Sequence, residues 1–242
     1  MKDTVSLPGN IAKVTGDFVG RLKDIYGEDL VSAVLYGSAS RGEFSKGASN
    51  VNIAVVLRDT GPDNLAKMRA LTGSFRFRTF RPVLFTESYL ARSLDVFPIE
   101  FLDIKENGIV LYGKDVFGSC DIDTTNLRFQ CEHELKALLI RARRIYMTYR
   151  DAGALKKALF GLTTSALHIS RNLLRTKGYL PGAGRAGVLD GISCRFNVDT
   201  GPFSAMFDAR DGVVRIRAGE VDALFRRFLS SLESLTEAAD RS

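Results

Sequence analysis

Two neighbouring points of the chain carry residues that could hold a phosphate group. An apolar segment with the composition of a buried strand, residues 30–36, runs into Gly37 and Ser38, which are expected to open a helix. Backbone N–H groups at such a turn can bind phosphate oxygens, and the Ser38 hydroxyl adds a donor. A second apolar segment, 51–57, begins beside Asn50 and Asn52, which share one face because side chains alternate along a strand.

The stretch 35–56 resembles the nucleotidyltransferase superfamily of DNA polymerase β type, in its minimal bacterial branch. The family pattern is Gly-Ser, a second glycine shortly afterwards, and Ser-Asp-x-Asp on the next strand. The residues found at the family spacing are Gly37, Ser38, Arg41, Gly42 and Ser49. The resemblance implies that Gly37, Ser38, Arg41 and Ser49 bind a nucleotide.

Two later regions strengthen this resemblance. The runs 95–105 and 110–113 are similar to bacterial members of the superfamily, and a helical C-terminal half is similar to that of aminoglycoside nucleotidyltransferases. The match covers residues 30–118 well and the helical half in outline.

The catalytic acids of the family are missing from this sequence. Its two metal-binding aspartates fall on Asn50 and Asn52, and the alignment puts Leu84 at the position of the third acid, which would activate the attacking hydroxyl. At an effective dielectric constant of ~20, two unit charges about 4 Å apart interact by ~4 kcal/mol, so replacing two carboxylates with amides should greatly weaken Mg²⁺ binding. The catalytic residues are therefore unassigned and no metal site is expected.

Other carboxylates could in principle replace the missing acids. The candidates are Glu43, Asp59, Glu87 and Asp103. None of them lies on the strand face that Asn50 and Asn52 share, so we do not expect these carboxylates to replace the missing aspartates.

Three functions are consistent with these residues. The first is a catalytically degenerate protein (a pseudoenzyme) that binds a nucleotide, a small ligand or a protein partner in the inherited cleft. The second is an active enzyme that uses Mg²⁺ and NTP to transfer NMP to a small molecule or a protein. The third is an antitoxin-like or scaffolding protein that acts through a protein partner or a homodimer.

The elements that position these residues predict an α/β (α+β) chain of two domains. Residues 1–118 alternate strands with helices and are expected to form a small mixed-sheet domain, with helices over 11–26, 62–71 and 88–94 and strands over 30–36, 51–57, 83–86 and 109–112. Residues 119–242 are expected to form a helical bundle, with long helices near 127–149, 154–177 and 221–239. The first of these helices should carry one apolar stripe, made of Leu127, Cys131, Leu135, Leu138, Ala142, Ile145 and Tyr149. The glycine-rich stretch 182–201 leaves room for one short helix.

Each of two basic segments has a structural and a functional interpretation. Residues 75–81 alternate phenylalanine with arginine, which is typical of a half-buried strand with Phe75 and Phe77 inward, or of a surface that stacks on bases and binds phosphates. Arg141, Arg143 and Arg144, followed by Lys156 and Lys157, form either a solvated face or a surface for an anion or a partner.

Composition excludes several protein classes. The chain has 242 residues, 45% of them hydrophobic, and a net charge of +6, of which +5 lies in residues 119–242. No apolar run approaches the ~20 residues of a membrane helix, and the first residues lack a secretory pattern. The three cysteines fit neither a disulfide framework nor a zinc site. We expect a cytoplasmic protein that does not act on nucleic acid or membranes.

Overall fold

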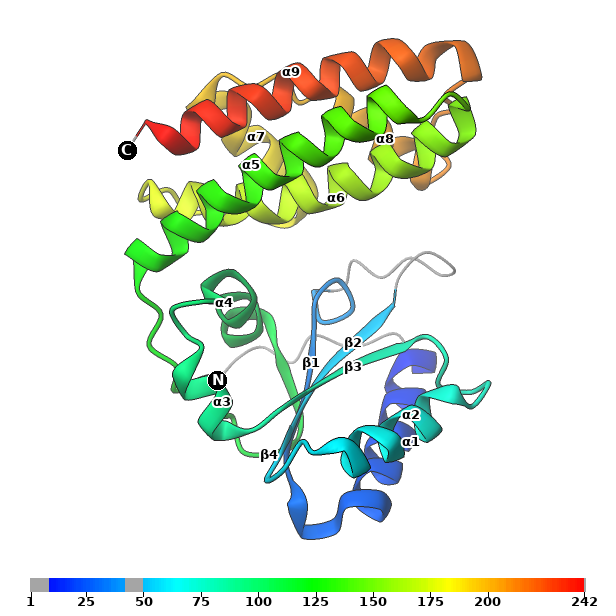
Figure 1. Ribbon diagram of the computed structural model, residues 1–242, viewed down its shortest axis with the longest axis vertical. Helices are drawn as coiled ribbons and strands as arrows, with labels where there is room; N and C mark the ends of the chain where they lie inside the picture. The colour runs from blue at the N-terminus through cyan, green and yellow to red at the C-terminus, as the bar shows by residue number, and fades with distance from the viewer. Residues whose placement is uncertain (1–8, 42–49, 242) are drawn as a thin grey trace. The chain divides into compact units, whose positions relative to one another are not determined.

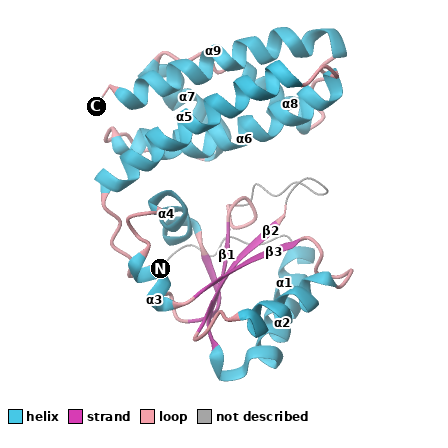
Figure 2. Cartoon of the chain, in the orientation of Figure 1, coloured by secondary structure: helices cyan, strands magenta, loops and turns pink. Residues whose placement is uncertain are grey.

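The chain divides into two compact units, Met1–Asp123 and Thr124–Ser242. The computed structural model describes residues 9–41 and 50–241, with side chains from residue 12 onward. The first unit combines a sheet with helices, and the described part of the second unit contains helices and no strand (Figures 1 and 2). The mixed fold class is thus as expected, and the division lies shortly after the expected boundary at residue 118.

A four-stranded mixed sheet forms the centre of the first unit. Its strands are β1 (Leu30–Tyr36), β2 (Val51–Leu57), β3 (Phe80–Phe85) and β4 (Ile109–Gly113), in the order β3-β2-β1-β4. Strand β1 is antiparallel to both β2 and β4, whereas β2 and β3 are parallel. The end of β1 therefore lies at the same edge of the sheet as the beginnings of β2 and β3.

The two faces of the sheet carry separate cores. The first core joins Ile53 and Val55 to Phe18 of α1 (Gly9–Tyr26) and Met68 of α2 (Pro62–Gly73). The second core joins Ala54 and Val56 of β2 to α3 (Glu87–Arg92) and α4 (Pro98–Asn107) through Leu90, Phe101 and Ile104. Because side chains alternate along β2, the positions of even number, including Asn52, face the side of α4.

Helix α4 has no counterpart among the expected elements. The run 95–105 served there only as a point of resemblance, yet Pro98 begins a helix of ten residues. Proline is well suited to a first helical turn, where its missing N–H has no partner to lose. Ile99, Phe101 and Ile104 are buried on its inner side.

The alternating segment 75–81 is not a strand along most of its length. Turns occupy residues 75–79, and β3 begins at Phe80. Phe77 is 5% exposed and packs edge-on against Phe18, as expected, whereas Phe75 is 80% exposed and lies under the guanidinium of Arg78. The expectation that Phe75 points inward is wrong because turn geometry does not follow the two-residue period of a strand.

Three long helices build the second unit. They are α5 (Thr124–Thr148), α6 (Ala152–Thr176) and α9 (Val221–Asp240), and each packs against the other two. The inner side of α5 includes Leu127, Cys131, Leu135 and Ala142, in agreement with the expected apolar stripe. Tyr149, which was expected to continue that stripe, is exposed because the helix ends at Thr148.

Shorter helices complete the second unit. The glycine-rich region holds α7 (Gly184–Phe196), and α8 (Gly201–Arg210) follows it where no helix was expected. Asn197 ends α7 in a left-handed conformation, and Pro202 lies in the first turn of α8. A 3₁₀ turn, η2 (Ala218–Glu220), leads into α9.

Two further properties concern the described residues as a whole. Cys120, Cys131 and Cys194 form no disulfide with one another, and the first two are buried. Within the ranges 9–41 and 50–241, no helix is long and apolar enough to cross a bilayer.

The different burial of two phenylalanines in one turn gives a stability test. Phe77→Ala should lower the free energy of unfolding by about 3–5 kcal/mol, because it removes a buried ring from the first core. Phe75→Ala should cost less than ~1 kcal/mol, since only the contact with Arg78 is lost. Urea unfolding followed by circular dichroism measures both. Equal losses of unfolding free energy in the two variants would contradict the different burial of Phe75 and Phe77 in this turn.

Candidate functional site

Gly37 makes a turn that lies against Asn52. Its φ of +80° is favourable only for glycine, and a Cβ atom there would lie 2.9 Å from Nδ2 of Asn52. The Gly37 carbonyl accepts hydrogen bonds from Ser40 Oγ at 2.9 Å and from the Arg41 N–H at 3.3 Å, which closes the turn. The described residues of this segment, up to Arg41, form a turn and not the expected helix.

The Ser38 side chain is free to meet a ligand. It is half-buried, and its hydroxyl makes no hydrogen bond with any residue that the structure describes. Ser40 differs, because its hydroxyl is 2% exposed and is used by the Gly37 carbonyl. Of the two serines in the turn, Ser38 is therefore the one available as a donor.

The strand register brings Asn52 between Tyr36 and Arg81. Asn52 is the antiparallel partner of Tyr36 on β1 and the parallel partner of Arg81 on β3. Asn50 directly precedes β2 and is exposed at the same edge of the sheet. The turn of Gly37, the two asparagines and Arg81 thus meet where β1 ends and where β2 and β3 begin.

The assignment of Leu84 to the third acidic position is corrected by this register. Leu84 pairs with Val55 and packs against the first core, on the face of α1. Asn52 belongs to the opposite face, so its side chain does not converge with that of Leu84. The β3 residue on the same face as Asn52, and directly beside it, is Arg81. The β3 side chain paired with Asn52 is therefore basic, and its Nη1 donates to the carbonyls of Arg78 and Phe80 at 2.7 and 2.9 Å.

Arg41 is engaged inside the protein. Its Nη1 donates to both carboxylate oxygens of Asp103 on α4, at 2.7 and 3.0 Å, and Asn107 also donates to Asp103 at 3.0 Å. The side chains of Arg41 and Asp103 are only 17% and 7% exposed. The expectation that Arg41 binds a nucleotide must therefore allow for this pair, which ties the turn to α4.

The same face of the sheet carries a tyrosine in a negative surrounding. Burial raises the pKa of Tyr36 above its ordinary value, and the carboxylates of Asp103 and Glu100 raise it further. The phenol of Tyr36 is consequently a neutral group at physiological pH and does not serve as a base beside Asn52.

The other described carboxylates that could have replaced the missing acids are engaged elsewhere. Asp59 accepts hydrogen bonds from the N–H of Gly61 and from Asn64, and Glu87 pairs with Lys114 at 2.6 Å. Within residues 9–41 and 50–241, no group of three or more His, Cys, Asp or Glu side chains is arranged to hold a metal ion. Gly42, Glu43 and Ser49 lie outside the described residues.

Comparison with known proteins supports the fold. No protein-family model matches the chain, and no curated protein does so. Among solved structures, the spectinomycin adenyltransferase AAD(9) from Enterococcus faecialis, crystallised with ATP and spectinomycin, matches with a TM-score of 0.56 at 12% identity. The match covers 90% of this chain and 98% of the other. The chain therefore has a nucleotidyltransferase-like fold.

The pair of Arg41 and Asp103 gives a second stability test. Arg41→Met should lower the free energy of unfolding by about 3–5 kcal/mol, because the carboxylate of Asp103 stays buried without its cation. The double variant Arg41→Met, Asp103→Leu should regain much of this loss. Arg21→Met, which removes an exposed ion pair with Asp24, is the matched control and should cost less than ~1 kcal/mol.

Chemical unfolding of the three variants decides the point. If Arg41→Met costs no more than Arg21→Met, the ion pair does not hold the turn against α4. Such a result would favour the nucleotide-binding role that the sequence comparison implies for Arg41.

Proposed function

We propose that this protein is a catalytically degenerate nucleotidyltransferase-like protein that binds the phosphates of a nucleotide without a metal ion. The binding region is the sheet edge formed by the turn of Gly37, by Asn50 and Asn52, and by Arg81. The observation that carries the proposal is the register that makes Arg81 the neighbour of Asn52.

The charges of this edge support phosphate binding. A metal-dependent transferase needs carboxylates to hold Mg²⁺, and the metal in turn neutralises the triphosphate. Here two neutral amides stand in the positions of the carboxylates, and Arg81 is the strand partner of Asn52. The Nη1 of Arg81 donates to the carbonyls of Arg78 and Phe80, and its other N–H donors have no partner among the described residues. A guanidinium binds phosphate oxygens directly through paired N–H donors, so it can supply the positive charge that the metal would otherwise supply.

The donors of the turn fit the same ligand. The half-buried Ser38 hydroxyl has no partner among the described residues, and the amides of Asn50 and Asn52 add N–H donors. The solved structure of AAD(9), which shares the fold, was crystallised with ATP. A nucleoside triphosphate is therefore the first ligand to test.

The binding of ATP is the direct test. Isothermal titration of the full chain should show binding in EDTA, with an affinity that Mg²⁺ improves little. Arg81→Gln should weaken binding about tenfold or more, since a hydrogen bond from a charged group contributes about 1.5–3 kcal/mol. Arg58→Gln is the matched control: Arg58 is an exposed arginine just past the other end of β2, and its removal should change nothing.

Three results would count against the proposal. Pyrophosphate release from NTP that needs Mg²⁺ and is lost in Ser38→Ala would show an active transferase. Failure to bind any nucleotide, together with a stable complex with a protein partner or a second copy, would favour an interaction protein. Equal effects of Arg81→Gln and Arg58→Gln would remove Arg81 from the site.

A restoring variant tests the corrected register. Asn50→Asp, Asn52→Asp and Arg81→Glu together should create a measurable affinity for Mg²⁺ or Mn²⁺, because three carboxylates would then share one edge and one face. The matched control carries Leu84→Glu in place of Arg81→Glu. It should bind metal more weakly and should be less stable, since its new carboxylate enters the first core. Stronger binding by the control would restore Leu84 as the third position.

A further inference from the structure

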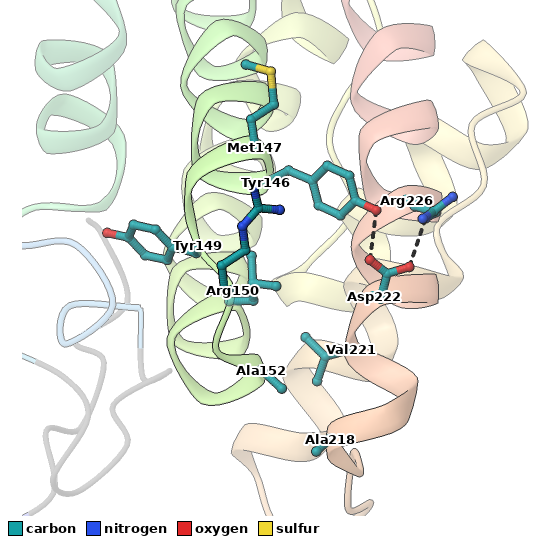
Figure 3. Close-up of a pocket in the computed structure, with 10 residues that line it drawn as sticks. Tyr146, Met147, Tyr149, Arg150, Ala152, Ala218, Val221, Asp222 and Arg226 are labelled. Atoms are coloured by element: carbon teal, nitrogen blue, oxygen red, sulfur yellow. Dashed lines mark hydrogen bonds and ion pairs between the residues drawn. The ribbon is translucent and has the colours of Figure 1, made fainter.

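A pocket in the helical unit is lined by none of the residues assigned to the proposed nucleotide site. It has a volume of about 700 Å³, and its lining comes from the end of α5, the start of α6, η2 and the start of α9. The lining residues are Tyr146, Met147, Tyr149, Arg150, Ala152, Leu155, Ala218, Val221, Asp222 and Arg226 (Figure 3). This volume falls in the range that small-molecule sites occupy in proteins.

We propose that this pocket binds a small organic anion with an apolar body, whose charged group pairs with Arg150. The proposal concerns the second unit and stands independently of nucleotide binding in the first. It rests on three properties of the pocket: a hydrogen-bonded polar wall, an apolar floor and one cation that has no partner among the described residues.

The polar wall is held by a network that links α5 to α9. Tyr146 donates its hydroxyl proton to Oδ1 of Asp222 at 2.7 Å, and Arg226 donates from Nε to Oδ2 of the same carboxylate at 2.8 Å (Figure 3). The Tyr146 ring also packs against Phe225, with centroids 5.3 Å apart. Fixed side chains lose little conformational entropy when a ligand binds, so this wall favours binding.

The same network removes Asp222 as a site for cations. Both of its oxygens are engaged, and the hydrogen bond from Tyr146, together with Arg226, lowers the pKa of Asp222 below its ordinary value. Asp222 therefore stays ionised, with its charge balanced by that of Arg226. The net charge of the lining residues is then that of Arg150.

Arg150 is the residue that indicates which class of ligand the pocket binds. Its side chain is exposed, and in the part of the chain that the structure describes it has no hydrogen bond or ion pair. Two acids close to the lining residues are used by the backbone. Asp151, next in sequence to Arg150, accepts from the Ala154 N–H at 2.6 Å, and Glu220, next to Val221, accepts from the Arg217 N–H at 2.7 Å. A carboxylate or phosphate could pair with Arg150 without displacing an existing partner.

The apolar lining residues form what we call the floor of the pocket, and they favour a ligand with an apolar body. Leu155 and Val221 are 8% and 2% exposed, and the small apolar side chains of Ala152 and Ala218 also line the pocket. Met147 lies at the mouth with 65% of its surface exposed, and its flexible thioether adapts to varied shapes. Covering these groups provides the hydrophobic part of the binding free energy.

The surrounding charge favours an anion over a cation. The second unit carries 19 basic and 12 acidic residues between Thr124 and Ser242. The corner between α5 and α6 contributes six of the basic residues and one acidic residue between positions 141 and 157. The field at this end of the unit therefore raises the local concentration of anions.

Methyl NMR of the full chain tests the pocket directly. The chain has four methionines, so labelling their methyl groups with ¹³C gives few signals, and Met147→Leu assigns the one in the pocket. Naphthoate and naphthyl phosphate serve as probes, and they distinguish a carboxylate ligand from a phosphate. Either probe should shift the Met147 signal in a saturable manner and leave that of Met68, in the first unit, unchanged.

Two matched comparisons assign the charge. Naphthamide, which has the ring without the charge, should bind at least about tenfold more weakly than naphthoate. Arg150→Gln should weaken the binding of the anions by a similar factor. Arg141→Gln changes an arginine of α5 that is outside the pocket lining, and it should leave anion binding unchanged.

The outcomes separate this site from the proposed nucleotide site. A shift of Met147 that depends on Arg150 and is unaffected by Ser38→Ala or Arg81→Gln supports the inference. Three results overturn it: neither anion shifts Met147, naphthamide binds as well as naphthoate, or Arg150→Gln and Arg141→Gln have the same effect. A failure of ATP to bind would reject the proposed function and leave this result untouched.

Discussion

The close approach of Gly37 to Asn52 is the constraint on which the candidate site depends. No side chain fits between them, since a Cβ atom on Gly37 would lie 2.9 Å from Nδ2 of Asn52. The positive φ of Gly37 turns the chain back at the end of β1, and the register then fixes which residues of β2 and β3 stand beside the turn. Any larger residue at position 37 would displace either the turn or the asparagine.

The ion pair of Arg41 and Asp103 extends this constraint to the opposite side of the turn. It joins residues 62 positions apart and brings α4 to the face of the sheet that carries Asn52. In a metal-dependent site, a carboxylate in this neighbourhood could bind a cation from solution. Here Asp103 binds a cation of the chain itself, Arg41, and it also accepts a hydrogen bond from Asn107. The acid thus holds the architecture of the site together and is not available to the ligand.

Sequence reasoning succeeded where one periodic pattern determined the structure. Strands β1 and β2 are continuous apolar runs, and the inner stripe of α5 repeats at helical spacing, so each could be placed to within a few residues. Leu84 was misplaced because β3 is apolar on both faces: Leu84 enters the first core and Phe85 packs against the second. Alternation in such a strand does not tell which residues face the site. The partner of Arg41 was equally hidden, because no local pattern connects it to Asp103.

The basic character of the chain is best understood from where its charges lie. Several arginines of the second unit are held in ion pairs, such as Arg143 with Glu233 and Arg227 with Asp199. Exposed pairs of this kind contribute little stability, but they do reduce the charge that a ligand meets. What remains is local. Arg150 follows the end of α5, and Arg81 lies beside two amides in the first unit. The Nη1 of Arg81 donates to the carbonyls of Arg78 and Phe80, whereas its other N–H donors have no partner among the described residues. Net charge describes the whole surface, whereas recognition of a small anion depends on the few cations whose donors are still free.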